Sequence, residues 1–143
     1  DPGKFEFRLL GVERFSPYTA KDEAGNALYA LDPLAPLPVP FLSYSKHAYL
    51  SKMTDMAFEA GPVFLKKTLY ETDMSESLKS MCQAGLGVAW LPESAVAGDS
   101  GLCCIPSPYF IDMEVRLYRR SQRNRDAPAG QEHVELAWHY WPD

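Results

Sequence analysis

The spacing of hydrophobic residues changes several times along the chain, which predicts a series of strands and helices. In the middle of the chain the order is strand, helix, strand, helix, strand. That order favours an α/β fold with a parallel sheet and crossover helices. The expected strands cover residues 5–20, 39–44, 63–71, 88–91, 102–105 and 112–119, and the expected helices cover 46–58, 73–84, 93–97 and 134–141.

Prolines and polar residues separate these elements. Four prolines keep the stretch 31–40 extended, because proline fixes the backbone and lacks an amide donor. Residues 22–26 are a polar turn, and residues 119–130 are arginine-rich and polar, which predicts a solvated loop. The helix expected near the C-terminus would carry its apolar residues on a face that docks on a core. Those residues are Val134, Leu136, Ala137, Trp138 and Trp141.

The stretch from Thr72 to Pro92 is the most informative part of the pattern. Asp73 is a candidate N-cap, with Glu76 at the position that completes a capping box. Leu78, Met81 and Cys82 then share one helical face. Gly85 is expected to end this helix, and Gly87 allows a tight turn into an apolar strand that ends at Pro92. The residues concerned are Gly85, Gly87, Val88, Ala89, Trp90, Leu91 and Pro92.

The same stretch resembles the effector-binding domain of LysR-type transcriptional regulators. That family has an A-G-x-G-x-x-x-L-P segment, matched here by Ala84, Gly85, Gly87, Leu91 and Pro92. The pieces LSYSKHAYLSKM and ETDMSESLKSMCQAGLGVAWLPESAV are most similar to the hypochlorite-responsive members. The resemblance implies a type 2 periplasmic-binding-protein-like α/β fold, with one complete lobe and part of a second.

The resemblance also implies how the chain is divided. Residues 1–16 would be a strand of the first lobe and the crossover, residues 17–106 the second lobe, and residues 107–143 the return strand and C-terminal helix of the first lobe. The N-terminal part of the first lobe would be missing. The remaining piece would leave an apolar sheet face and a sheet edge uncovered.

Charge, hydropathy and cysteine count exclude several classes of function. Acidic residues outnumber basic ones 19 to 14, for a net charge of −5, which argues against a nucleic-acid surface in this segment. No apolar run reaches the roughly 18 residues that a membrane-spanning helix needs. Three cysteines, Cys82, Cys103 and Cys104, cannot form a closed disulfide set, so reduced cytoplasmic thiols are expected.

Two polar segments are candidates for effector binding. The first follows a predicted strand, where ligands of open α/β sheets collect beside helix N-termini. It comprises Ser43, Tyr44, Ser45, Lys46 and His47. The second lies at the corresponding end of the next strand and comprises Thr72, Asp73 and Ser75. The structural alternative is that Ser45 and Asp73 only cap their helices and that Lys46 and His47 are solvated.

Oxidation is a further hypothesis. Methionine sulfoxide is polar, so oxidation of a thioether can act as a switch. Met74 is the candidate redox switch because it lies where a helix begins, and because of the resemblance to hypochlorite sensors. The other methionines, Met53, Met56, Met81 and Met113, are expected to fill the core. Cys82 would need exposure and a lowered pKa to react, which its apolar helix face opposes.

Catalysis has little support. The histidines are scattered, and the chain has no G-x-S-x-G, H-E-x-x-H or P-loop motif and no metal-binding spacing. No cofactor is expected. The resemblance implies a homo-oligomeric regulator that responds to a small-molecule effector or an oxidant. It would contact DNA only through a separate N-terminal helix-turn-helix, absent from this chain. The alternative is a lobe of a periplasmic-type solute-binding protein.

Overall fold

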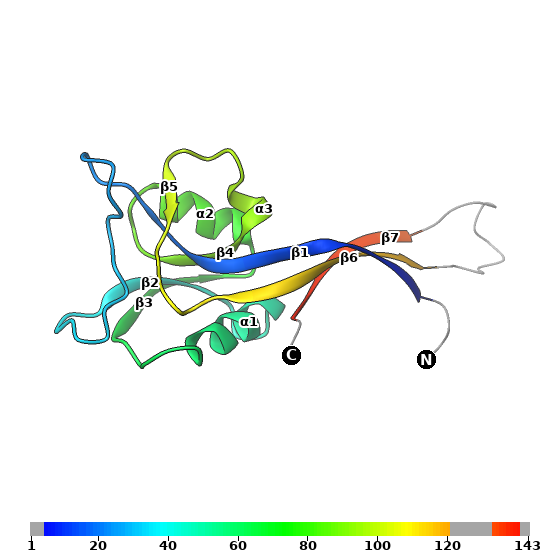
Figure 1. Ribbon diagram of the computed structural model, residues 1–143, viewed down its shortest axis with the longest axis horizontal. Coiled ribbons are helices and arrows are strands. Elements are labelled where there is room, and N and C mark those ends of the chain that lie inside the picture. Colours follow the sequence, from blue (N-terminus) through cyan, green and yellow to red (C-terminus); the bar gives the residue numbers. More distant parts are fainter. Residues whose placement is uncertain (1–4, 121–132, 141–143) are drawn as a thin grey trace. The chain divides into compact units, whose positions relative to one another are not determined.

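A computed structural model of the chain describes residues 5–120 and 133–140. They belong to two compact units, unit 1 (Asp1–Glu13 and Asp112–Asp143) and unit 2 (Arg14–Ile111). The elements in chain order are shown in Figure 1. They are β1 (Phe5–Ala20), β2 (Val39–Tyr44), α1 (Tyr49–Phe58), β3 (Lys66–Thr72), α2 (Ser75–Gln83), β4 (Ala89–Pro92), α3 (Glu93–Val96), β5 (Leu102–Cys104), β6 (Ile111–Arg120) and β7 (His133–Tyr140).

The strands of unit 2 combine parallel and antiparallel pairing. β2 and β3 are parallel, with an irregularity in register between Phe41 and Leu42. A parallel bridge from Phe41 to Val88 carries the pairing on towards β4. The second half of β1 is antiparallel to both β4 and β5. The α/β class with parallel strands is therefore confirmed, and the sheets are mixed.

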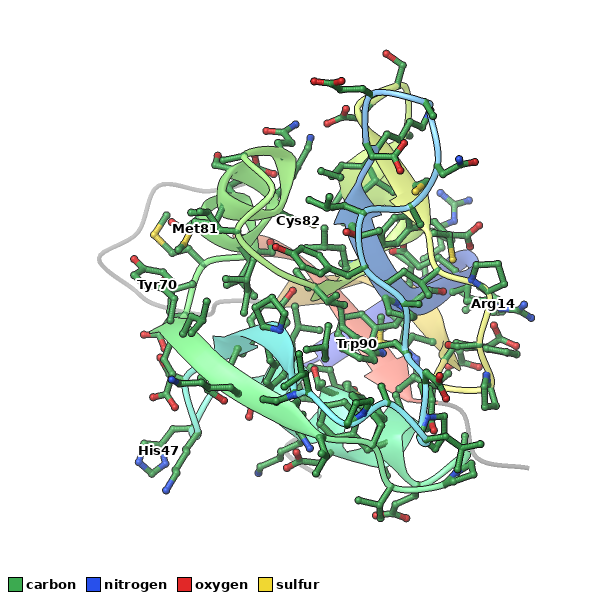
Figure 2. The ribbon with its side chains drawn as sticks, turned by 90° about the vertical axis from the view of Figure 1, so that its left-hand side faces the viewer. Arg14, His47, Tyr70, Met81, Cys82 and Trp90 are labelled. Carbon is green, nitrogen blue, oxygen red and sulfur yellow. The ribbon has the colours of Figure 1, made fainter. Side chains whose placement is uncertain are left out.

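Aromatic side chains fill the centre of unit 2. Trp90 is 1% exposed and lies edge-on to the rings of Phe41 and Phe58, with ring centroids 5.8 and 5.0 Å away. Its indole Nε1–H donates to the carbonyl of Tyr109 at 2.8 Å, which satisfies the one polar atom of the side chain. Figure 2 shows Trp90 in the interior of the unit. In Figure 1, α2 lies on one side of the strands and α1 on the other.

Two glycines make the turn from α2 into β4, as the sequence predicts. Gly85 has φ +80°, which L side chains rarely adopt. A Cβ on Gly87 would lie 2.8 Å from the carbonyl oxygen of Pro40. That close approach allows Val88 N–H to donate to Pro40 and Val88 C=O to accept from Leu42, both at 2.9 Å. The turn therefore joins β4 to β2.

Among the described residues, unit 1 contains the first part of β1 together with β6 and β7. β6 and β7 are antiparallel, from Met113 opposite Tyr140 to Arg120 opposite His133. The C-terminal helix expected at residues 134–141 is wrong over residues 134–140, which form β7 instead. The segment HVELAWHY also alternates apolar and polar residues with period two, and a full-length antiparallel partner selects that pattern over the helical one. The arginine-rich loop beyond Arg120, and Trp141, lie outside the described residues.

Candidate functional site

The two polar segments come together at the carboxyl ends of two paired strands. Tyr44, the last residue of β2, lies directly opposite Thr72, the last residue of β3. Beyond the strands, the backbone N–H of Ser45 donates to the carbonyl of Thr72 at 2.9 Å. The chain segments that lead into α1 and α2 are therefore hydrogen-bonded neighbours. We call the segments 43–47 and 72–75 the strand-end site.

Both helices that follow the strand-end site begin without a side-chain cap. The N-cap of α1 is Ala48 and that of α2 is Met74, and neither makes a capping hydrogen bond through its side chain. The expectations that Ser45 and Asp73 are N-caps are therefore wrong. A tight turn, in which Ala48 N–H donates to the Ser45 carbonyl at 2.9 Å, delays the start of α1 by three residues. At α2 it is Thr72 Oγ1, not Asp73, that accepts the N–H of Met74, at 3.2 Å.

This geometry leaves polar groups at the site that the helices do not use as caps. At the helix starts, the N–H of Ser51 donates to the carbonyl of Ala48 and the N–H of Ser77 to the carbonyl of Met74, both at 3.1 Å. A helix N-terminus that no side chain caps is a place where water or a ligand can bind. Lys46, His47 and Asp73 are exposed, whereas Ser45 and Ser75 are half-buried. Figure 2 shows His47 pointing away from the body of unit 2.

Two of the candidate residues face inward or bond locally. Tyr44 is 2% exposed, and its hydroxyl donates to the carbonyl of Trp90 at 2.8 Å. Burial raises the pKa of this phenol, so it stays neutral. Ser43 Oγ donates to the carbonyl of Tyr44 at 2.8 Å. The side chain of Tyr44 is therefore part of the core, and Ser43 is held against the backbone of its own strand.

Sulfur-containing side chains differ sharply in exposure. Met74 is 62% exposed and Met56 38% exposed, whereas Met53 and Met113 are 5% and 0% exposed. Cys82 is buried, and its thiol donates to the carbonyl of Tyr18 at 3.2 Å. Burial raises the pKa of the Cys82 thiol to about 12. At neutral pH Cys82 is therefore an unreactive core residue, as the sequence predicts.

The sequence predicts a helix start with backbone N–H groups here, but it places that start at Ser45 and misses Ala48 as the N-cap of α1. Alanine is a poor N-cap, so nothing in the sequence identified Ala48 as the residue before the helix. Within the described residues, no group of three or more His, Cys, Asp or Glu side chains could hold a metal ion. In the same part of the chain, no helix has the length and apolar character needed to cross a bilayer.

Comparison with known proteins identifies the family. The LysR substrate binding domain matches residues 1–133. The chain belongs to this family. The resemblance seen in residues 84–92 is confirmed, and the regulator is favoured over a periplasmic solute-binding protein. The chain is an effector-binding domain of the LysR type, with a periplasmic-binding-protein-like fold that is present in part.

Curated relatives are longer than this chain. It is 35% identical over 129 residues to the HTH-type transcriptional regulator YjiE of Escherichia coli (strain K12), covering 89% of this chain and 42% of YjiE. The same identity and length relate it to QseD of Escherichia coli O157:H7, described as an HTH domain-truncated transcriptional regulator, of which 52% is covered. The chain thus spans about half the length of the curated relatives it matches.

Solved structures of LysR regulatory domains have the same fold. The apo regulatory domain of HypT from Salmonella typhimurium matches with a TM-score of 0.72 and 25% identity, covering 88% of this chain and 63% of that domain. Its bromide-bound form matches with a TM-score of 0.69 and 25% identity, covering 88% and 62%. Full-length HypT is described as a hypochlorite-specific LysR-type transcriptional regulator.

Proposed function

We propose that this domain senses a small anion or a chemical oxidant at the strand-end site, and that it does so as part of a cytoplasmic, homo-oligomeric LysR regulator. The observation that carries the proposal is the meeting of two uncapped helix starts at the ends of paired strands. Tyr44 and Thr72 lie side by side, and the N-cap residues of both following helices make no capping hydrogen bond through their side chains. Ligands of open α/β sheets bind at such strand ends.

The α1 half of the site favours an anion. The N-terminus of a helix carries a partial positive charge, which favours a negative ligand there. Lys46 and His47 lie directly before Ala48, the N-cap residue of α1, and are exposed, so they can approach the same ligand. Asp73 stands before α2 and opposes an anion in that half. The bromide-bound form of the HypT regulatory domain is consistent with a small anion as ligand.

Met74 supplies the response to an oxidant. A thioether reacts without losing a proton, so exposure selects which methionine reacts first, and Met74 is 62% exposed. As the N-cap residue of α2 it has no acceptor to offer the first N–H groups of that helix. Oxidation to the sulfoxide adds an acceptor oxygen at this position. The changed start of α2 would then alter the strand-end site that α1 and α2 share. One structural neighbour, full-length HypT, is described as hypochlorite-specific, which supports this choice of oxidant.

An anion titration tests the first part. We expect sodium bromide to raise the melting temperature of the purified chain above that in an equal concentration of sodium gluconate. Lys46→Ala and His47→Ala should each weaken this shift at least threefold. Lys52→Ala is the matched control, because Lys52 is also exposed but lies inside α1. Equal shifts in all three variants would contradict an anion site at residues 46–47.

Limited oxidation tests the second part. With equimolar hypochlorite, peptide mass spectrometry should find Met74 oxidised before Met56, and Met53 and Met113 last. Met74→Gln should mimic the sulfoxide by providing an acceptor and should reduce amide exchange at the start of α2. Met56→Gln, a change on an exposed position of α1, should not. Faster oxidation of Met56 than of Met74 would refute the assignment.

Signalling in the whole protein would follow from a shift between two arrangements of its lobes. A ligand moves such an equilibrium only by its different affinities for the two states.

We further propose that DNA is bound by a separate helix-turn-helix. The 143-residue chain should therefore show no specific footprint on DNA at physiological salt, and a footprint would overturn this division of labour.

A further inference from the structure

A buried threonine hydroxyl in unit 2 lacks a hydrogen-bond partner. Thr19 lies in the second half of β1, its side chain is 0% exposed, and its Oγ1 atom has no partner among the described residues. Burying a hydroxyl without a partner costs free energy, so nearly all buried polar groups in proteins are paired. Thr54 shows the usual arrangement, because it is also buried and its Oγ1 donates to the carbonyl of Leu50 at 2.7 Å. The hydroxyl of Thr19 therefore lacks a polar group that a chemical change beside it could supply.

The side chain directly opposite Thr19 is a cysteine. Thr19 pairs with Cys103 of β5 in the antiparallel register of β1 and β5. Residues directly opposite each other in such a pair point to the same face, with Cβ atoms about 4.5–5.5 Å apart. The Oγ1 atom of Thr19 is therefore within reach of a polar group attached to the Cys103 sulfur. Cys103 is an unbridged cysteine and is half-buried, so a small solute can reach its thiol.

The other two cysteines have different surroundings. Adjacent residues of a strand point to opposite faces, so Cys104 faces away from Thr19, and there it is hydrogen-bonded to Ser16. Cys82 is 0% exposed, and its thiol already donates to a backbone carbonyl. Burial raises the pKa of both of these thiols, and their neighbour Cys103 adds to each shift. Of the three cysteines, Cys103 is the one that combines access from solvent with an unsatisfied buried hydroxyl.

We propose that Cys103 is a site of reversible oxidation by a hydroperoxide, and that Thr19 holds the sulfenic acid that forms. The sulfur attacks one peroxide oxygen, so an S–O bond forms and the O–O bond breaks. Sulfur gives up two electrons, and the second peroxide oxygen takes them and leaves with the thiol proton as water or an alcohol. The new S–O–H group donates to Oγ1 of Thr19, which gives that hydroxyl its missing partner.

The sulfenic acid at Cys103 persists because neither of the other thiols can condense with it. A disulfide forms when a thiolate attacks the oxidised sulfur. Burial raises the pKa of Cys82 to about 12, so this thiol stays protonated at neutral pH. Cys104 lies on the opposite face of β5. A reductant can therefore return Cys103 directly to the thiol, and the modification is reversible.

Dimedone labelling of the 143-residue chain tests the proposal. The chain is treated with hydrogen peroxide, the excess is removed with catalase, and dimedone is then added to trap sulfenic acid for peptide mass spectrometry. We expect the adduct at Cys103, and we expect dithiothreitol added before dimedone to prevent it. Thr19→Val removes the hydroxyl and should lower the adduct at least fivefold, with more sulfinic acid at Cys103. Thr54→Val is the matched control, because Thr54 is also buried but its hydroxyl has a partner, and it should leave the adduct unchanged.

Thermal unfolding provides a second readout of the same hydroxyl. Thr19→Val should melt at a higher temperature than the parent chain in the reduced state, because it removes an unsatisfied buried group. If this variant does not fold, Thr19→Ala replaces it, and Thr19→Ser, which keeps the hydroxyl, should retain the adduct.

Several results would overturn the proposal. They are the absence of an adduct, an adduct at Cys104 in place of Cys103, an adduct that loss of the Thr19 hydroxyl leaves unchanged, and a disulfide between Cys82 and Cys103. The readout is a cysteine adduct in β5, so neither the anion titration nor the oxidation of Met74 affects its outcome.

Discussion

Gly87→Ala should be among the most costly single-methyl changes in this chain, for a reason that is steric and not conformational. A Cβ at this position would lie 2.8 Å from the carbonyl oxygen of Pro40 and 3.1 Å from Cγ of Leu42. The obstructing oxygen belongs to the backbone of β2, so no side-chain rotation can relieve the contact. The strand itself must move away.

Moving the strand costs free energy of unfolding in two ways, through packing and through backbone hydrogen bonds. Forcing one extra methyl group into a packed site costs about 1–3 kcal/mol. The two hydrogen bonds that join Val88 to Pro40 and Leu42 are 2.9 Å long, and each contributes about 0.5–1.5 kcal/mol. If the shift breaks both, the total loss is about 2–6 kcal/mol of the free energy of unfolding.

Gly98→Ala is the matched control. Gly98 has φ +79°, but a Cβ there would meet nothing within 4 Å. Its substitution therefore measures backbone strain alone, which costs about 1–2 kcal/mol for a left-handed residue. Gly87 shows no such positive φ, so the two variants separate contact from conformation.

Urea unfolding, followed by far-ultraviolet circular dichroism, measures both variants against the parent chain. We expect Gly87→Ala to lose more stability than Gly98→Ala, with an unchanged m-value. Native-state hydrogen exchange should speed up at the amides of Val88 and Leu42 only in the Gly87 variant. A Gly87→Ala loss below about 0.5 kcal/mol, typical of neutral surface changes, would refute the steric reasoning. So would an equal loss in the two variants without faster exchange at Val88.

Two further predictions concern the core. Trp90→Phe removes the donor to the Tyr109 carbonyl. It should lower the free energy of unfolding by about 1–3 kcal/mol, because a buried acceptor is left without its partner. A loss within error of zero in urea unfolding would contradict this. Stability should also fall as the pH rises from 9 towards 12. The pKa of Cys82 in the folded chain, about 12, exceeds its ordinary value of 9.0, so the unfolded chain loses this proton first and its ionisation favours unfolding. The contribution is fully present below pH 9. Burial also raises the pKa of Tyr44, which acts in the same direction at higher pH. Cys82→Ala should therefore flatten the decline in stability without abolishing it. Parallel curves of stability against pH for the variant and the parent chain would disprove the assignment to Cys82.

The sequence predicts best where local chemistry alone decides the structure. Gly85 occupies the left-handed position that ends α2, and Leu78 and Cys82 form the buried face of that helix. The parallel pairing of β2 with β3 also followed from the order of elements. In these cases the backbone preference of a residue and the tertiary structure agree, so reasoning from either gives the same answer.

The sequence predicts less well where a distant partner makes the decision. Residues 134–140 fit both a helical and an alternating pattern, and β6 selects the strand by pairing along all of β7. The tight turn at residues 45–48 likewise depends on the hydrogen bond from Ser45 to Thr72, which joins segments far apart in the sequence. Neither contact is encoded in a local run of residues.

The failed cap predictions bear directly on function. Ser45 and Asp73 have side chains that cap helices well, yet both lie outside the capping position, and Ala48 and Met74 occupy it instead. A capped helix start would gain about 1 kcal/mol of stability from the same residue types. Both uncapped starts lie at adjoining strand ends, where the proposed effector site would place a ligand at the helix N-termini in the position of a side-chain cap. The loss of local stability and the candidate binding site therefore have the same physical origin.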